Sequence, residues 1–243
     1  MSPVNVAVLA SGRGSNLQSL LDAFAHADAP ARVALVVSNT EAAGALARAR
    51  AAKVATLVTR KDGQDAAGLL AAFHEQGIQV IVLAGWLRKL PAELVRAFPR
   101  RIVNVHPALL PAFGGPGMYG EHVHEAVLAS GARVSGATVH LVDEEYDRGA
   151  VLAQWPVPVH AHDSVEHLAA RVLAAEHRLL PRVVADVCRR VAAGADAVPL
   201  AVAAEHFGSA LRPQIELSDP VIQPPRPPSP PPRSARAGRR AAR

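Results

Sequence analysis

The sequence predicts an α/β fold: a doubly wound, mostly parallel sheet with an antiparallel hairpin at its edge. Between residues 4 and 106, short β-branched runs alternate with longer stretches rich in alanine and leucine. This alternation is typical of parallel strands joined by right-handed helical crossovers. Later in the chain, two apolar runs are separated only by the polar turn DEEYDRGA. The turn is too short for a helix, so the two runs are expected to pair as an antiparallel hairpin.

Each expected strand is apolar enough to be covered on both faces, and each expected helix repeats apolar residues at helical spacing. In the first helix, for example, Leu17, Leu20 and Leu21 recur in this way. The expected strands cover residues 4–10, 33–38, 55–58, 80–84, 102–106, 134–142 and 151–157. The expected helices cover residues 16–25, 41–52, 66–76, 91–98 and 164–193.

Two features are expected in the long last helix. Asp163 is followed three residues later by Glu166, which predicts a capping box at the helix start. Pro181 falls in the middle of the same segment. Because proline lacks a backbone N–H and its ring collides with the preceding turn, we expect it to break or kink the helix.

Composition divides the chain into a domain over residues 1–211 and a tail over 212–243. The net charge is +5, and the seven arginines of the tail, against two acids, account for all of it. The tail also holds nine of the 20 prolines. Such a segment cannot bury enough apolar surface to offset its chain entropy, so it is expected to be disordered. The neutral domain gives no reason to expect a nucleic-acid partner.

Several classes of protein are disfavoured. No apolar run reaches the roughly 20 residues that a membrane span needs, and the N-terminus reads as a first strand because it lacks the basic region of a signal peptide. Cys188 is the single cysteine, so an internal disulfide is impossible and a cytoplasmic location is expected. The pairs His122/His124 and His160/His162 lack the spacing of a metal site. No motif for a serine or cysteine nucleophile is present.

The turn that follows the first strand, residues 11–16 (SGRGSN), is the first candidate site. Its glycines permit close backbone approach, and the following helix offers unpaired N–H groups and the positive end of its dipole, which suits a phosphate. The alternative is an ordinary tight turn in which Ser15 caps the helix and Gln18 completes a capping box. The residues alone leave both interpretations open.

Asn104 and His106 form the second candidate, at the end of the strand over 102–106. Residues two apart in a strand project from the same face, so an amide and an imidazole could together bind an oxygen that becomes negative during a reaction. They could equally cap the strand end. The next segment, 108–120, holds four glycines and two prolines and is expected to be a mobile cover.

The third candidate is the acidic turn over 143–149. One of its carboxylates, delivered beside His106, would keep the imidazole protonated and could relay protons through water. Spacing does not say which acid this is. His140, on the preceding strand, could be structural or could support the site.

Five segments, read together, carry a resemblance to a known family. They are SGRGSNLQSLLDA, VLAGWLRKLP, IVNVHPALLPAFGG, GATVHLVDEEYDRGAVLAQ and AEHRLLP, in this order between residues 4 and 181. In this combination the chain closely resembles the folate-dependent formyltransferases. GSNLQ and AEHRLLP single out the branch that acts on glycinamide ribonucleotide, the phosphoribosylglycinamide formyltransferases of purine biosynthesis.

The resemblance implies a formyltransferase-like fold, a reaction and a set of site residues. The reaction is transfer of a formyl group from 10-formyltetrahydrofolate, as co-substrate, to the amine of 5-phosphoribosylglycinamide (GAR), without a metal. The implied catalytic residues are Asn104, His106 and Asp147, supported by His140. The implied GAR contacts are Gly14, Ser15, Asn16 and Glu176. The implied folate contacts are Leu87, Arg88, Lys89, Leu90, Asn104 and Lys61, with Arg60 as the rival of Lys61.

Two related activities and one unrelated one remain as alternatives. A formyltransferase acting on methionyl-tRNA is expected to need a further C-terminal nucleic-acid-binding domain, and a 10-formyltetrahydrofolate hydrolase an N-terminal regulatory domain. A protein that binds nucleic acid through its basic tail is the third. The expected partners are therefore the two small-molecule substrates, with no membrane partner and with a monomer or a homodimer left open.

Overall fold

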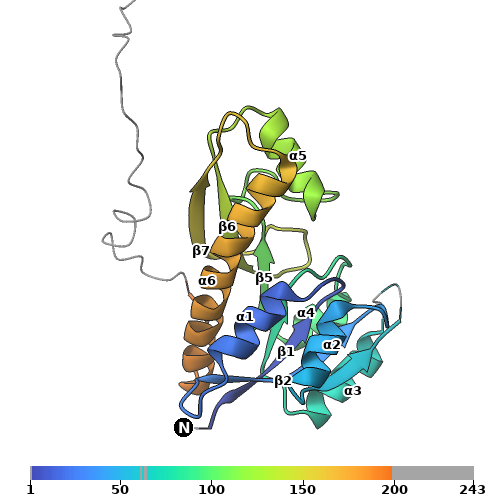
Figure 1. Ribbon diagram of the computed structural model, residues 1–243. Helices are drawn as coiled ribbons and strands as arrows, with labels where there is room; N and C mark the ends of the chain where they lie inside the picture. Colours follow the sequence, from blue (N-terminus) through green and yellow to red (C-terminus); the bar gives the residue numbers. More distant parts are fainter. Residues whose placement is uncertain (1, 61, 63–64, 199–243) are drawn as a thin grey trace, which may run out of the picture. The chain divides into compact units, whose positions relative to one another are not determined.

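The computed structural model describes residues 2–60, 62 and 65–198, and a seven-stranded sheet in the order β3-β2-β1-β4-β5-β6-β7 lies at its centre (Figure 1). The sheet is parallel from β3 to β5, whereas β6 and β7 are antiparallel at one edge. The predicted fold class is therefore confirmed. The strands are β1 (Val4–Leu9), β2 (Ala31–Ser38), β3 (Ala55–Val58), β4 (Val80–Leu83), β5 (Ile102–His106), β6 (Val134–Leu141) and β7 (Val151–Pro158).

Helices cover both faces of the sheet, as a doubly wound fold requires. One face packs against α1 (Ser15–Ala23), α2 (Gly44–Ala51), α5 (Glu121–Ala129) and α6 (Val165–Ala192). The opposite face packs against α3 (Ala66–Glu75) and α4 (Ala92–Ala97). The side chains of β1 alternate between the two cores: Val6 and Val8 belong to the first, Ala7 and Leu9 to the second. Burial on both faces explains why this strand is apolar without interruption.

Helix α5 was not expected from the sequence. It begins directly after the glycine-rich segment 108–120, and its N-cap is Gly120 with φ 57° and ψ −133°. Its buried face consists of Val123, His124 and Val127. A histidine in that face and a short length of nine residues give little helical periodicity, so no sequence pattern indicated the helix.

The caps of α6 differ from the expectation. Ser164 is the N-cap, its hydroxyl accepts from the N–H of His167, and the His167 side chain completes the capping box. Asp163 does not cap the helix with Glu166 as expected. Its carboxylate accepts from both terminal nitrogens of Arg171, at 2.7 and 2.8 Å, and from the N–H of His160 at 2.8 Å. Asp163 therefore pairs with Arg171, which lies about two turns along the helix, and does not cap the helix start.

Pro181 does not break α6, which runs without interruption from Val165 to Ala192. The proline forfeits one backbone hydrogen bond, but it is itself buried, as are its neighbours Leu180 and Val183. Packing of these side chains against the sheet retains the helix across the missing bond. Further along, Cys188 is buried, and burial raises the pKa of its thiol to about 12.

The expected tail and its boundary cannot be compared with the structure. The proline- and arginine-rich tail over 212–243, together with its boundary at residue 211, lies outside them. Within residues 2–60, 62 and 65–198, no helix combines the length and the apolar character that a membrane span requires.

Gly149 fixes the end of the acidic turn against β6, and this leads to a first prediction. Gly149→Ala should lower the free energy of unfolding by about 2 kcal/mol, because the added Cβ would overlap the carbonyl oxygen of Leu141. Urea denaturation followed by circular dichroism measures the change. Gly12→Ala is the control, since a Cβ there meets nothing within 4 Å. Equal stability of the two variants would contradict this account of Gly149.

Candidate active site

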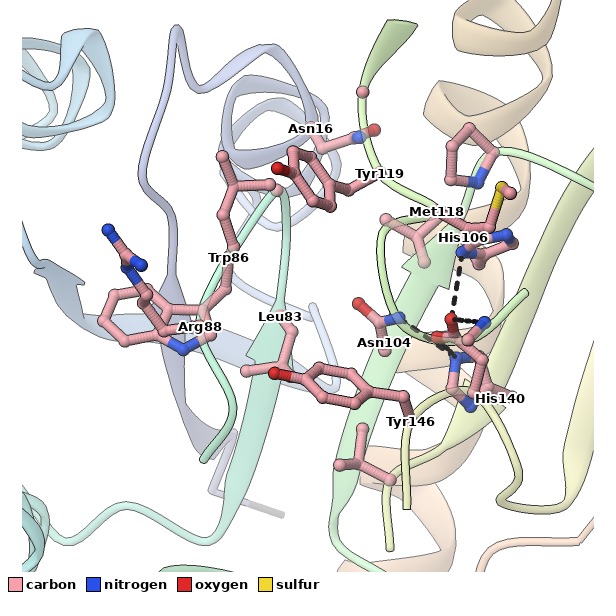
Figure 2. A pocket seen from close by; sticks show the side chains of 18 of the residues that line it. Asn16, Leu83, Trp86, Arg88, Asn104, His106, Met118, Tyr119, His140 and Tyr146 are labelled. Atoms are coloured by element: carbon pink, nitrogen blue, oxygen red, sulfur yellow. Dashed lines mark hydrogen bonds and ion pairs between the residues drawn. The ribbon is translucent and has the colours of Figure 1, made fainter. Parts of the chain in front are cut away.

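A cavity of about 580 Å³ lies beyond the carboxyl ends of β1, β4 and β5. This is where open parallel sheets bind ligands, and the volume is typical of small-molecule sites. The cavity unites the three candidate segments, because its lining includes residues of the 11–16 turn, the end of β5 and the acidic turn. Figure 2 shows Asn104, His106 and His140 on one side of it and Leu83, Trp86 and Arg88 on the other.

Asn104 and His140 are joined across two neighbouring strands. They are directly opposite each other in the antiparallel pairing of β5 with β6, where side chains on one face meet. Asn104 Nδ2 donates to His140 Nε2 at 3.0 Å, and His140 Nδ1 donates to the carbonyl oxygen of Leu141 at 2.8 Å. With one ring nitrogen as donor and the other as acceptor, a neutral imidazole satisfies both bonds. His140 thereby fixes the orientation of the Asn104 amide.

His106 is 3% exposed at the end of β5. Its Nε2 donates to the carbonyl oxygen of Phe113 at 2.8 Å, so the segment 108–120 contacts the imidazole directly. Its Nδ1 lies 3.7 Å from Asp147 Oδ2, a separation too long for a hydrogen bond but short enough for the carboxylate to favour the charged form of the ring.

Asp147 lies between two imidazoles. Its backbone has φ 54°, in the left-handed region, which costs a non-glycine residue about 1 kcal/mol. Oδ2 accepts from the N–H of Gly115 at 2.9 Å, and Oδ1 lies 3.5 Å from His140 Nε2. Burial acts to raise the pKa of Asp147, but the contacts with His140, Gly115 and His106 outweigh it, and the pKa is lowered overall. The side chain is therefore a carboxylate at neutral pH.

The other acids of the turn have different partners. Asp143 accepts from the backbone N–H of Glu145 at 2.9 Å, and Glu144 forms an exposed ion pair with Arg96 at 3.2 Å. Asp147 is thus the carboxylate that the turn delivers to the histidine, the choice that spacing alone left open.

The protonation state expected of His106 is not the one that the structure favours. Burial lowers the pKa of His106 below its ordinary value, and the raising effects of Asp147 and of the Phe113 carbonyl do not restore it. The sequence led us to expect that a neighbouring carboxylate would keep the ring charged. That expectation omitted the desolvation of a side chain buried on all sides. The lowered pKa favours the neutral imidazole in the free protein.

Helix α1 begins without a side-chain cap. Its N-cap is Gly14, with φ 75° and ψ 29°, and a Cβ there would lie 2.6 Å from the Cα of Ala45. The alternative of a capping box formed by Ser15 and Gln18 is wrong, because the Gln18 side chain bonds instead to Asp22 and Arg48. The start of α1 is therefore open to an external anion.

Glu176 and Asn16 form a buried pair between α6 and α1. Asn16 Nδ2 donates to Glu176 Oε2 at 2.6 Å, and both residues line the cavity. Burial raises the pKa of Glu176 to about 7, although the bond from Asn16 acts in the opposite direction. Of the residues expected to contact GAR, Asn16 and Glu176 therefore meet in the cavity, whereas Gly14 and Ser15 do not line it themselves.

The segment expected to contact folate lines the cavity at residues 87–90. Lys61 lies outside the described residues, so its contact stays a prediction. Its rival Arg60 forms an exposed ion pair with Asp62 at 3.1 Å and is not among the described residues of the lining.

Several lining residues were given no role by the sequence reasoning, among them Trp86, Tyr119, His124 and Tyr146. Tyr146 lies beneath Lys89, whose Nζ is 5.8 Å from the ring centroid. His124 is 5% exposed and its Nδ1 has no partner among the described residues. His124 lies in a helix that was not expected, and the three aromatic residues are not part of a spaced motif, so no sequence pattern indicated them. Only Tyr146 could have been found, because it directly precedes Asp147.

Across residues 2–60, 62 and 65–198, no group of three or more histidine, cysteine, aspartate or glutamate side chains is arranged to hold a metal ion. His122 pairs instead with Glu125, with 3.7 Å between Nδ1 and Oε2.

A family model described as formyl transferase matches residues 4–184, the segment that builds the sheet and the cavity. The chain belongs to the formyl transferase family. One relative is a phosphoribosylglycinamide formyltransferase of Arabidopsis thaliana, described as chloroplastic. It is 45% identical over 202 residues, which are 80% of this chain and 69% of the relative.

Two further matches extend the comparison. The trifunctional purine biosynthetic protein adenosine-3 of Homo sapiens is 37% identical over 183 residues, 72% of this chain but only 17% of the relative. A crystal structure of phosphoribosylglycinamide formyltransferase from Brucella melitensis matches with a TM-score of 0.70 and 39% identity. That match covers 77% of this chain and 96% of the other.

The charge on Asp147 leads to a prediction about its neighbour. Asp147→Asn should lower the pKa of His106 further, because an anion that favours the imidazolium is removed. Titration of the His106 ring protons by NMR measures this change. Asp143→Asn, in the same turn, is the matched control and should leave the His106 pKa in place. A His106 pKa that rises or stays constant in Asp147→Asn would refute the proposed electrostatic contact.

Glu176 leads to a prediction about stability. Its folded-state pKa of about 7 exceeds the unfolded value of about 4.3, so between these values the folded protein binds more protons than the unfolded chain. The free energy of unfolding should therefore fall as pH rises through this window, by about 2–3 kcal/mol from this group. Glu176→Gln should remove that contribution.

Urea denaturation of both proteins at pH 5 and pH 8 provides the measurement. Glu75→Gln, at an exposed position of α3, is the control. If the wild type and Glu176→Gln lose the same stability between the two pH values, Glu176 does not titrate in this way.

Proposed function

We propose that the protein transfers the formyl group of 10-formyltetrahydrofolate to the amine of GAR, yielding formyl-GAR and tetrahydrofolate in purine biosynthesis. The observation that carries the proposal is the convergence of an amide, an imidazole and a carboxylate on one cavity of about 580 Å³. The chain's place in the formyl transferase family supports the same reaction.

The acceptor amine would attack the formyl carbon and turn the carbonyl oxygen into an oxyanion. Asn104 Nδ2 carries two hydrogens, one of which is bound to His140, so the second can be donated to this oxygen. Because His140 holds the amide in place beforehand, no reorganisation is needed as the charge develops. A donor of this kind typically contributes about 3–4 kcal/mol to the transition state.

His106 would be the second donor. Its Nε2 proton is bound to the neutral carbonyl of Phe113, and an oxyanion competes well for it because charge-assisted hydrogen bonds are about twice as strong. The nearby carboxylate of Asp147 favours positive charge on the ring as the oxyanion forms. The ring donates a hydrogen bond through Nε2, and its own protonation state need not change.

Collapse of the adduct breaks the bond between the formyl carbon and the folate nitrogen N10. One proton must leave the acceptor nitrogen and one must reach N10, so the protons balance. Asp147, a carboxylate at neutral pH, would accept the first and return it through an ordered water. The enzyme needs no nucleophile, since the acceptor amine is one. The inert thiol of Cys188 agrees with this.

The two ends of the cavity suit the two substrates. At the α1 end, the uncapped helix start suits a phosphate, and the Asn16–Glu176 pair offers oxygen acceptors for ribose hydroxyls. At the other end, Leu83, Trp86 and Leu90 form an apolar wall of the kind that binds flat heterocycles. Lys61 is proposed to contact the folate at this end.

We also propose a reducing compartment, the cytoplasm, for this reaction, because the single cysteine is buried and unpaired. The proposed substrates are both small molecules.

A spectrophotometric assay with 10-formyl-dideazafolate tests the activity. Deformylated product should form only when GAR is present, which separates a transferase from a hydrolase. Asn104→Ala should lower kcat by about 100- to 1000-fold, and Asp147→Asn by about 100-fold or more, with the fold retained in both.

Glu144→Gln is the matched control for charge, since Glu144 pairs with the exposed Arg96 and should turn over like the wild type. Product formation without an acceptor would replace the transferase by a hydrolase. Near wild-type turnover of Asp147→Asn would remove that carboxylate from the mechanism.

A further inference from the structure

Arg13 occupies the turn between β1 and α1 and lines the cavity. Its backbone is held from α2: Arg48 Nε donates to the carbonyl oxygen of Arg13 at 3.0 Å, and the N–H of Ala45 donates to that of Gly12 at 3.1 Å. Arg48 also donates to Gln18 at 3.0 Å and so ties the turn to the first helix. The turn is therefore fixed on the side away from the cavity.

The Arg13 side chain does not contribute a polar contact to the described part of the fold. Its guanidinium forms no hydrogen bond or ion pair with any residue that the structure describes, whereas Arg48, Arg96 and Arg171 all have such partners. An exposed guanidinium that offers five donors and a positive charge is free to serve a ligand.

Positive charge is otherwise scarce at this end of the cavity. Helix α6 contributes Ala169, Leu173 and Glu176 to the lining, none of which is a cation. The described lining has two other cations, Arg88 and Lys89, both of which follow β4. Figure 2 shows Arg88 on the side of the cavity opposite Asn104. Arg13 is thus the lining cation that is adjacent in sequence to the uncapped start of α1.

Asn16 supplies a second, independent sign of a ligand. It is 8% exposed, it lines the cavity, and its Oδ1 has no partner among the described residues. A buried carbonyl oxygen without a donor is costly, and a hydroxyl of a bound sugar would satisfy it. A sugar that carries a phosphate meets both requirements, the hydroxyl at Asn16 and the anion at the start of α1.

We propose that Arg13 determines selectivity for a phosphorylated acceptor by placing its guanidinium against the phosphate dianion at the start of α1. The planar fork of arginine matches two phosphate oxygens, and the helix N-terminus attracts the same anion. The proposal rests on the function proposed above and adds a specificity-determining residue to it.

Two measurements on Arg13→Gln test this role. The first is kcat/KM for GAR and for the same acceptor without its phosphate. The ratio of the two values should fall about 10- to 30-fold in Arg13→Gln, with the loss concentrated in KM for GAR. The second is calorimetric titration with ribose 5-phosphate, which requires no formyl transfer. Its Kd should rise by a similar factor.

Arg50→Gln is the matched control, because it removes the same charge from an exposed position of α2 outside the lining. It should change neither quantity by more than about 2-fold. Thermal melting confirms that both variants fold.

The outcomes separate this inference from the proposed function. If the wild type fails to transfer the formyl group but ribose 5-phosphate binds and Arg13→Gln weakens it, the role of Arg13 stands without that function. An unchanged acceptor ratio or an unchanged ribose 5-phosphate affinity in Arg13→Gln overturns the inference, as does a wild type that does not bind ribose 5-phosphate.

Discussion

The site depends on one carboxylate that is held in a strained backbone conformation between two imidazoles. Asp147 can reach both His106 and His140 only because the turn after β6 folds back over β5 and brings residue 147 to a left-handed φ. The antiparallel register places His140 opposite Asn104, and Gly115 ties the segment 108–120 to the same carboxylate. Four separate parts of the chain are therefore positioned relative to a single side chain.

Burial and charge oppose each other at this site, and burial dominates at the histidine. The pKa of His106 is lowered despite the carboxylate beside it, while that of Asp147 is lowered by its hydrogen bonds. The resting site therefore favours a carboxylate at Asp147 beside a neutral ring at His106. In the proposed reaction, Asp147 and His106 are already adjacent before substrate binds, and such preorganised groups stabilise developing charge effectively.

The fold and most of the site could be predicted from sequence because strand order, apolar runs and motif positions are local properties. The seven strands fall within one or two residues of the expectation, and the cavity lies at the predicted strand ends. The predictions that were wrong concern groups that compete for the same partner or position. Asp163 binds Arg171 and does not cap α6, and packing of the α6 side chains retains the helix despite the hydrogen bond lost at Pro181. Likewise, the burial that lowers the pKa of His106 depends on the whole fold, so the spacing of residues in the sequence could not predict it.

The single thiol of the chain has a practical consequence. With its pKa raised to about 12 and its side chain inside the core, Cys188 stays protonated, and thiol reagents act on the thiolate. The natural chain therefore serves as an unreactive background for site-directed labelling. A cysteine introduced on the segment 108–120 could carry a fluorophore that tests whether this segment moves over the cavity, without prior removal of any native residue.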